Sequence, residues 1–184
     1  MQRALVERAQ AGDHDAFSVL VRASVPRLLG AATLILRDRD RAQDAVQDAL
    51  VSAWRDVRAL RDPDAWEAWI HRLVVRACYR EADRHRRRRL LSDTFDPTPP
   101  TVGDGSRDLA DRDEIERGFR RLSVEQRAIL VLHFHVGLSS AETSLVLGIP
   151  EGTARTRLHR ALRAMRAALE ADARAIQFNP GRPA

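Results

Sequence analysis

Residues 138–165 read Leu-Ser-Ser-Ala-Glu-Thr-Ser-Leu-Val-Leu-Gly-Ile-Pro-Glu-Gly-Thr-Ala-Arg-Thr-Arg-Leu-His-Arg-Ala-Leu-Arg-Ala-Met, and this stretch decides the fold of the second half of the chain. Ser139 and Glu142 have the spacing of a capping box, which begins a helix. Gly148 can adopt the left-handed conformation that ends a helix, and Pro150 suits the start of the next one. The stretch therefore predicts a short helix, a tight turn and a longer helix, which together form a helix-turn-helix.

The longer helix of this stretch presents two different faces. At 3.6 residues per turn, its apolar side chains fall on one side, where they are expected to pack: Ala154, Leu158, Ala161, Leu162 and Met165. The opposite side is polar and basic, and no carboxylate lies between residues 152 and 168. A face that is merely solvated normally mixes charges of both signs, so we interpret this one as a DNA-reading surface. It comprises Arg155, Thr156, Arg157, His159, Arg160 and Arg163.

The 184-residue chain carries 31 basic and 26 acidic residues, a net charge of +5, and this charge is unevenly distributed. Residues 1–91 hold 18 Arg against 13 acids, residues 92–116 hold 2 against 8, and residues 117–184 hold 11 against 5. Two basic modules therefore flank an acidic connector. Residues 92–110 are also rich in Pro and Gly, so they are expected to be a linker between domains at 1–91 and 111–175, with a tail at 176–184.

Composition excludes several classes of protein. No run of about 18 apolar residues is present and the N-terminal residues are charged too early for a signal peptide, so we expect a cytoplasmic protein without membrane insertion. The single cysteine, Cys78, cannot form an internal disulfide or a Cys-rich zinc site and is expected to be buried. His71 and His85 lie two helical turns from Cys78, too far to share a metal ion with it. We therefore expect no metal site and no cofactor.

A helix predicted over residues 41–60 combines a packing side with an unusual exposed side. The packing side carries Ala42, Val46, Ala49, Leu50, Ala53 and Val57. The other side places an apolar residue, Val51, among polar ones. This composition favours a protein-docking surface, although an ordinary solvated helix face can share it. We name these residues the docking patch: Asp44, Gln47, Asp48 and Val51.

Asp62 and Pro63 are expected to open a long helix that ends near Leu91. Its buried stripe comprises Trp66, Ile70, Leu73, Val74 and Ala77. Beside that stripe, aromatic and basic residues recur at helical spacing, and an Arg-rich run follows at residues 84–89. Such a face suits single-stranded nucleic acid, because bases stack on rings and guanidinium planes. The alternative is that Trp66 and Trp69 are both core residues and the arginines are solvated.

The remaining segments are also predicted to be helical. Helices are expected over residues 2–11, from 13 to about 36, and over 111–122, where Ile115 and Phe119 should point inward. Ser123 and Gln126 form a second capping box, which starts a helix that Gly137 ends. The last helix is expected to end near Ala175. The sequence thus predicts an all-α fold: two small helical domains joined by a flexible linker, the second a helix-turn-helix.

Nearly the whole chain resembles the extracytoplasmic-function (ECF) group of the sigma-70 family of bacterial RNA polymerase sigma factors. In the first module, residues 42–54 read Ala-Gln-Asp-Ala-Val-Gln-Asp-Ala-Leu-Val-Ser-Ala-Trp and are similar to the diagnostic part of region 2. The second module is similar to region 4 at residues 122–127, 138–142 and 147–160. The chain departs from the family pattern at Arg76 and Arg80, where Asn and then Asp or Asn are usual.

The resemblance implies an alternative sigma factor that directs promoter-specific transcription initiation and has no enzymatic activity. It implies that the docking patch binds the clamp helices of the largest subunit of core RNA polymerase. The DNA-reading surface would contact minus-35 promoter DNA, and an anti-sigma factor is a further expected partner. Recognition and melting at minus-10 would fall to residues 60–66 and the long helix, which gives a minus-10 set: Asp62, Trp66, Trp69, Arg72, Arg76 and Tyr79.

The sequence is also compatible with two other functions. A stand-alone helix-turn-helix transcription regulator that does not dock on core polymerase is the main alternative, because response regulators share nearly this pattern. A metal-dependent phosphohydrolase is the second, because Asp40, Asp44 and Asp48 recur every four residues on one helix. No His, Glu or Lys accompanies these aspartates at ligand or acid-base spacing, which disfavours the enzyme.

Overall fold

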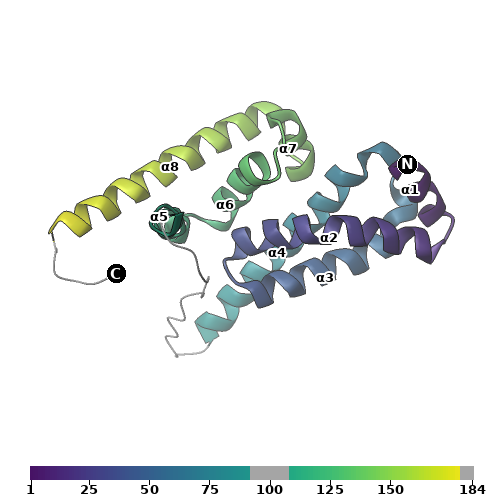
Figure 1. Ribbon diagram of the computed structural model, residues 1–184, viewed down its shortest axis with the longest axis horizontal. Helices are drawn as coiled ribbons and strands as arrows, with labels where there is room; N and C mark the ends of the chain where they lie inside the picture. The colour runs from purple at the N-terminus through teal and green to yellow at the C-terminus, as the bar shows by residue number, and fades with distance from the viewer. Residues whose placement is uncertain (92–107, 179–184) are drawn as a thin grey trace.

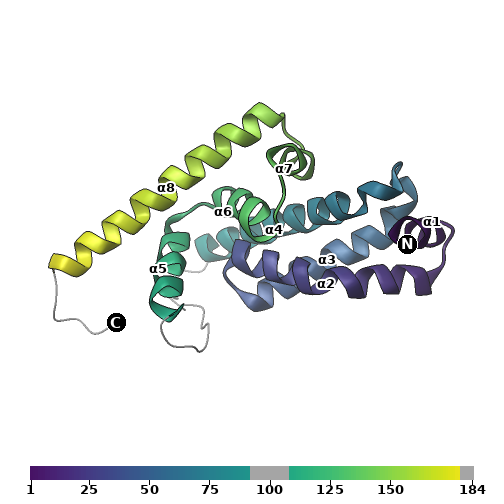
Figure 2. The same cartoon turned by 45° about the horizontal axis from the view of Figure 1, so that its top comes forward.

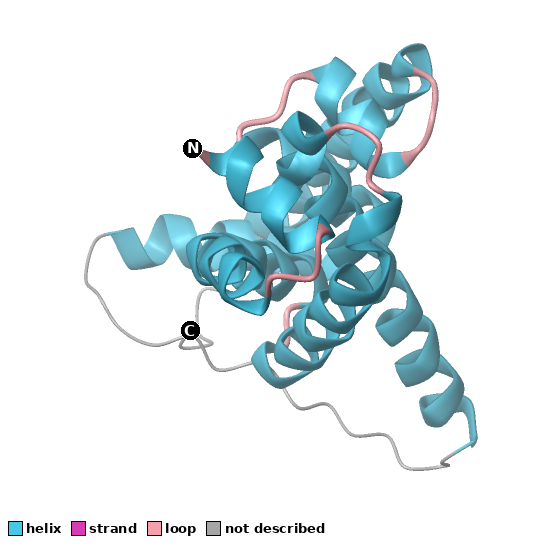
Figure 3. Cartoon of the chain, turned by 90° about the vertical axis from the view of Figure 1, so that its right-hand side faces the viewer, coloured by secondary structure: helices cyan, strands magenta, loops and turns pink. Residues whose placement is uncertain are grey.

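The computed structural model describes residues 1–91 and 108–178, and these residues form helices joined by short loops (Figure 1). The first module contains α1 (Gln2–Gln10), α2 (His14–Leu36), α3 (Arg39–Asp56), the 3₁₀ turns η1 (Val57–Ala59) and η2 (Pro63–Ala65), and α4 (Trp66–Leu91). The second contains α5 (Asp108–Arg121), α6 (Val124–Leu130), the π-helical turn η3 (Val131–His135), α7 (Ser140–Leu147) and α8 (Glu151–Phe178). Figure 3 shows no strand among the described residues, which confirms the predicted all-α fold.

The helix boundaries follow the capping signals of the sequence. The Asp13 carboxylate accepts a hydrogen bond from the Ala16 amide at 3.0 Å and starts α2. Both predicted capping boxes form, at Ser123 before α6 and at Ser139 before α7. Gly148 ends α7 in the left-handed conformation, with φ of 67°. The short helix, tight turn and long helix predicted for residues 138–165 are therefore confirmed.

Several predicted details differ from the structure. α5 begins at Asp108, inside the expected linker, and α8 continues past Ala175 to Phe178 because no Gly or Pro interrupts it before Pro180. Residues 92–107 of the expected linker, and residues 179–184 of the expected tail, lie outside the described residues.

Two side chains that were expected to pack are exposed, Ile115 by 51% and Leu162 by 38%. The close contact between α5 and α8 lies instead at Gly118, where an added Cβ would lie 2.7 Å from the Met165 Cε.

α2 is the apolar centre of the first module. By length and composition alone this helix could cross a membrane. It packs instead against α1, α3 and α4, and its residues Leu28, Ala32 and Ile35 are fully buried. The buried side of α2, 39% of its most apolar stretch, belongs to the core of the first module.

The two modules share part of one hydrophobic core. Ala128, Val131, Leu132 and Val146 of the second module belong to the same buried cluster as the core residues of α2 and α4. α7 packs on α4, and α6 and η3 pack on α2; Figure 2 shows α6 and α7 beside α4. A smaller cluster, formed by Leu122, Ile129, Leu130 and Ala161, holds α5, α6 and α8 together. We call this packing of the two modules the closed arrangement.

Candidate docking and nucleic-acid surfaces

The docking patch lies on the outer side of α3. Asp44, Gln47 and Val51 are exposed, and Val51 keeps 46% of its surface in solvent, as the sequence predicted. Asp48 is half-buried, and its carboxylate pairs with the Arg84 guanidinium of α4 at 3.1 Å. The patch therefore combines one free apolar side chain with acidic groups, and it sits at the boundary between α3 and α4.

A buried carboxylate that sequence reasoning missed supports this boundary. Glu81 of α4 is only 4% exposed. It accepts hydrogen bonds from Arg41 Nε at 3.3 Å and from Arg84 Nε at 2.9 Å. Because Arg84 also reaches Asp48, the Glu81 network links the docking patch to α4. Arg41 and Glu81 are 40 residues apart, so no local pattern indicates their contact.

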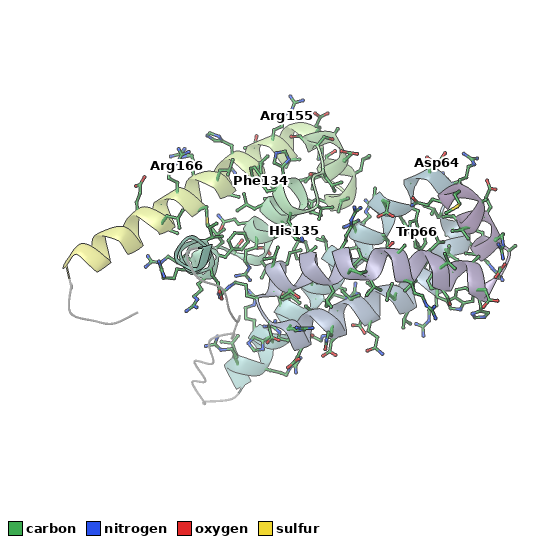
Figure 4. All side chains as sticks on the ribbon, in the orientation of Figure 1. Asp64, Trp66, Phe134, His135, Arg155 and Arg166 are labelled. Carbon is green, nitrogen blue, oxygen red and sulfur yellow. The ribbon has the colours of Figure 1, made fainter. Side chains whose placement is uncertain are left out.

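The DNA-reading surface lies on α8, just after the Gly148 turn. All six of its residues are exposed, whereas Ala154 and Ala161 on the other side of the helix are fully buried. Figure 4 shows Arg155 near the first turns of α8, pointing away from the first module. The structure thus presents the predicted face to solvent at the start of the helix, where a recognition helix contacts base edges in the major groove.

Individual residues of this surface differ in their local partners. Arg155 pairs with Glu151 one turn earlier, at 2.5 Å, so this guanidinium must leave a carboxylate to reach DNA. The Thr156 hydroxyl donates to the Gly152 carbonyl at 2.9 Å. Arg157 lies close enough to the first module for its positive charge to lower the pKa of Tyr79, although burial raises that pKa by more.

The minus-10 set does not form one open surface. Asp62 is exposed and caps η2 by accepting a hydrogen bond from the Asp64 amide at 3.0 Å, and Arg76 is exposed on α4. Trp69 is half-buried. Trp66 is fully buried, packing edge-on against Phe17 at 6.1 Å between ring centroids. A ring with no exposed surface cannot stack on a base, so the prediction of a DNA contact does not hold for Trp66, which is a core residue.

The second module covers part of the same set. An added Cβ on Gly148 would lie 2.6 Å from the Arg72 Nη2, so the turn of the helix-turn-helix rests directly on Arg72. Burial, together with the nearby Glu125 carboxylate of the second module, raises the pKa of Tyr79 to about 12. Arg72 and Tyr79 are therefore half-covered in the closed arrangement.

Polar contacts also join the two modules where α6 meets the end of α2. The Arg127 guanidinium of α6 donates from Nε to the Ile35 carbonyl at 2.6 Å, at the end of α2. Its Nη1 donates to the Phe119 and Leu122 carbonyls at the end of α5. Arg37 adds an ion pair with Glu116 at 3.0 Å. His135 of η3 lies against α2, where an added Cβ on Gly30 would be 3.1 Å from its Nε2 (labelled in Figure 4).

The titratable groups that could hold a metal ion are dispersed. Among the described residues, no three His, Cys, Asp or Glu side chains come together as a metal site. Cys78 is fully buried, as predicted, and burial raises the pKa of its thiol to about 12. His71 is also buried and contacts the Glu67 carbonyl through Nδ1 at 2.8 Å.

Each of the two modules matches a known protein family. Residues 20–88 match the family model for sigma-70 region 2, and residues 112–165 match the model for sigma-70 region 4. The chain is 38% identical over 156 residues to the ECF RNA polymerase sigma factor SigM of Mycobacterium tuberculosis, covering 82% of this chain and 76% of that protein. It is 32% identical over 178 residues to the RNA polymerase sigma-H factor of Pseudomonas aeruginosa, covering 90% and 92%.

Solved structures share the fold. The structure of CnrH in complex with the cytosolic domain of CnrY matches with a TM-score of 0.68 and 27% identity, covering 93% of this chain and 98% of that one. The sigma factor RpoE of Bartonella quintana, in complex with the anti-sigma factor NepR, matches with a TM-score of 0.71 and 22% identity, covering 85% and 98%.

Proposed function

Because this chain belongs to the ECF group of RNA polymerase sigma factors, we propose that its two modules perform separate tasks within one initiation complex. The chain is an alternative sigma factor, which binds core RNA polymerase and promoter DNA and directs transcription initiation. We assign it no covalent chemistry, and its place of action is the cytoplasm, where the polymerase works.

The first module docks on core polymerase through the docking patch. An exposed apolar side chain with a rim of acidic groups suits a partner surface that is apolar at its centre and basic around it. Val51 supplies the apolar contact, while Asp44 and Asp48 supply the charge. The partner is the pair of clamp helices of the largest polymerase subunit.

The second module reads the minus-35 duplex with the DNA-reading surface. The observation that carries this assignment is the exposed, carboxylate-free face that follows the left-handed turn at Gly148. Arg155 and Arg160 can each bind a guanine through two hydrogen bonds, whereas Arg163, farther along α8, is placed to meet phosphate.

The first module engages the minus-10 region with Asp62, Trp69, Arg72, Arg76 and Tyr79. Since the second module half-covers Arg72 and Tyr79, these two side chains become available only when the modules separate. Docking on polymerase, with the two modules held at the two promoter elements, supplies that separation. An anti-sigma factor is a further partner, since the sigma factor RpoE of Bartonella quintana, which is similar to this chain, is in complex with the anti-sigma factor NepR.

Gel filtration with purified core RNA polymerase separates this function from that of a stand-alone regulator. We expect the chain to co-elute with core polymerase in the absence of DNA. A chain that binds promoter duplex tightly but elutes apart from core polymerase would be a helix-turn-helix regulator instead.

A further inference from the structure

A cationic cleft lies in the seam between the two modules, and the proposed function does not use it. Its volume is about 390 Å³. Four arginines line it, three from α3 and α4 and one from α6, together with apolar side chains from both modules. We call it the seam cleft: Arg41, Arg86, Arg89 and Arg127, with Leu36 and Val124 among the apolar residues.

The positive charge of the seam cleft is only partly balanced. Arg127 donates to three backbone carbonyls and has no carboxylate partner among the described residues. Arg89 likewise has no ion-pair partner in the described part of the chain, and Arg41 shares its partner Glu81 with Arg84. Only Arg86 has its own carboxylate, Asp83, at 3.2 Å.

The titration behaviour of the lining groups agrees with this excess of positive charge. Burial, together with the nearby charges of Arg37 and Arg41, lowers the pKa of the Arg127 guanidinium to about 10. Burial also lowers the pKa of His85, which lines the cleft, and Arg41 and Arg89 add to that effect. The charged forms of Arg127 and His85 are thus disfavoured by their neighbours, and a bound anion would relieve that repulsion.

We propose that the seam cleft binds a small phosphorylated ligand of about mononucleotide size. Guanidinium groups match phosphate because their planar N–H donors form paired, charge-assisted hydrogen bonds. The volume falls within the range of small-molecule sites, and Leu36 and Val124 offer an apolar wall to a ring or chain attached to the phosphate. Phosphate on the arginines and an apolar portion on the wall would together fill the cleft.

The site is complete only in the closed arrangement. Val124 and Arg127 come from the second module, whereas the other residues that line the seam cleft come from the first. A ligand that binds the closed arrangement and not the open one stabilises the closed arrangement by mass action. It would therefore oppose polymerase docking and promoter opening. This regulatory consequence rests on the proposed function, whereas the ligand site itself does not.

Calorimetric titration and thermal unfolding of the full chain test the site, with ADP, pyrophosphate, adenosine and citrate as probes. We expect ADP to bind best, pyrophosphate to bind more weakly, and adenosine and citrate not to bind. At about 100 times its dissociation constant, ADP should raise the unfolding midpoint by about 5 to 10 °C. Arg89→Gln should weaken ADP binding at least about tenfold, the equivalent of one lost charge-assisted hydrogen bond.

Arg87→Gln is the matched control, because Arg87 is exposed on the same helix and does not line the cleft. Its affinity for ADP should equal that of wild type. If both variants weakened ADP binding equally, or if citrate bound as tightly as ADP, the binding would be general electrostatic attraction and the proposal would be overturned.

A further comparison separates the ligand from the chain's own acidic connector. If wild type binds no probe but a variant with Asp93, Asp96 and Asp104 changed to Asn does, the connector is the occupant and the proposal fails. Finally, ADP should weaken core polymerase binding by wild type and not by Arg89→Gln. ADP that binds without this effect would leave the site standing and refute its regulatory role.

Discussion

Reversing a charge in the docking patch should abolish polymerase binding while the chain stays folded. The most informative change is Asp48→Arg. In the free chain, this substitution removes only the ion pair between Asp48 and Arg84. The two side chains of that pair are 45% and 49% exposed. A pair that exposed contributes about 0.2 to 1 kcal/mol, and the new Arg–Arg repulsion is of similar size. The total loss of stability, at most about 2 kcal/mol, is small beside the roughly 5 to 15 kcal/mol that holds a typical domain folded.

The effect on binding should be much larger than the effect on stability. A cation placed against the basic rim of the partner costs several kcal/mol, and even about 2 kcal/mol weakens binding by about 30-fold. The assay is fluorescence anisotropy of a labelled chain titrated with core RNA polymerase, and circular dichroism melting confirms that the variant folds.

Arg84→Gln is the control, because it breaks the same ion pair from the α4 side without changing the docking patch. It also removes one donor to Glu81, which keeps its partner Arg41. It should bind polymerase within about threefold of wild type, the change expected from loss of an exposed charge pair. Wild-type binding by Asp48→Arg would refute the docking patch. Equal weakening by Arg84→Gln would show that the ion pair, rather than a contact with polymerase, is what matters.

Three further predictions concern the DNA-reading surface, the start of α7 and the buried thiol. In the polymerase complex, Arg155→Ala should cost about 1 to 3 kcal/mol of binding free energy on the preferred promoter and relax the preference at one base. Arg163→Ala should instead weaken binding to all single-base promoter variants alike. If both variants weakened binding uniformly, the division into base and phosphate contacts would be refuted. Ser139→Ala should destabilise the chain by about 1 kcal/mol in urea unfolding, because it removes the cap of α7, and no change would show that the cap is dispensable. Cys78 should react with a thiol reagent at pH 8 only as fast as the chain unfolds, since its folded pKa is about 12. Because this folded pKa is above the ordinary 9.0, the buried neutral thiol favours the folded state most below about pH 9. That contribution to the free energy of unfolding is lost as the pH rises from 9 toward 12, and Cys78→Ala should not show the loss.

The helix-turn-helix could be predicted from the sequence because its signals are local. Ser139 and Glu142 are three residues apart, and Gly148 takes its left-handed conformation whatever lies beyond the turn. The docking patch was also predictable in outline, since helical periodicity separates Val51 from the packing side of α3.

The seam between the modules could not be predicted in the same way. Arg127 and Ile35 are 92 residues apart, and nothing in either local sequence indicates that a guanidinium of one module caps a helix of the other. Helical periodicity placed Trp66 in the buried stripe of the long helix, and its full burial agrees with that prediction. The family resemblance, rather than periodicity, had added Trp66 to the minus-10 set. Gly118 is a signal that could have been used, since glycine in the middle of a helix is costly and often marks a close helix crossing.

Run-off transcription with purified components shows whether this chain confers promoter-specific initiation on core RNA polymerase. Templates come from genomic fragments selected by binding to the complex of core polymerase with this chain. We predict that core polymerase alone produces no discrete transcript, that adding wild-type chain produces transcripts from defined start sites, and that adding Asp48→Arg does not. The account would be contradicted if wild-type chain bound these templates without polymerase and left the pattern of transcription unchanged.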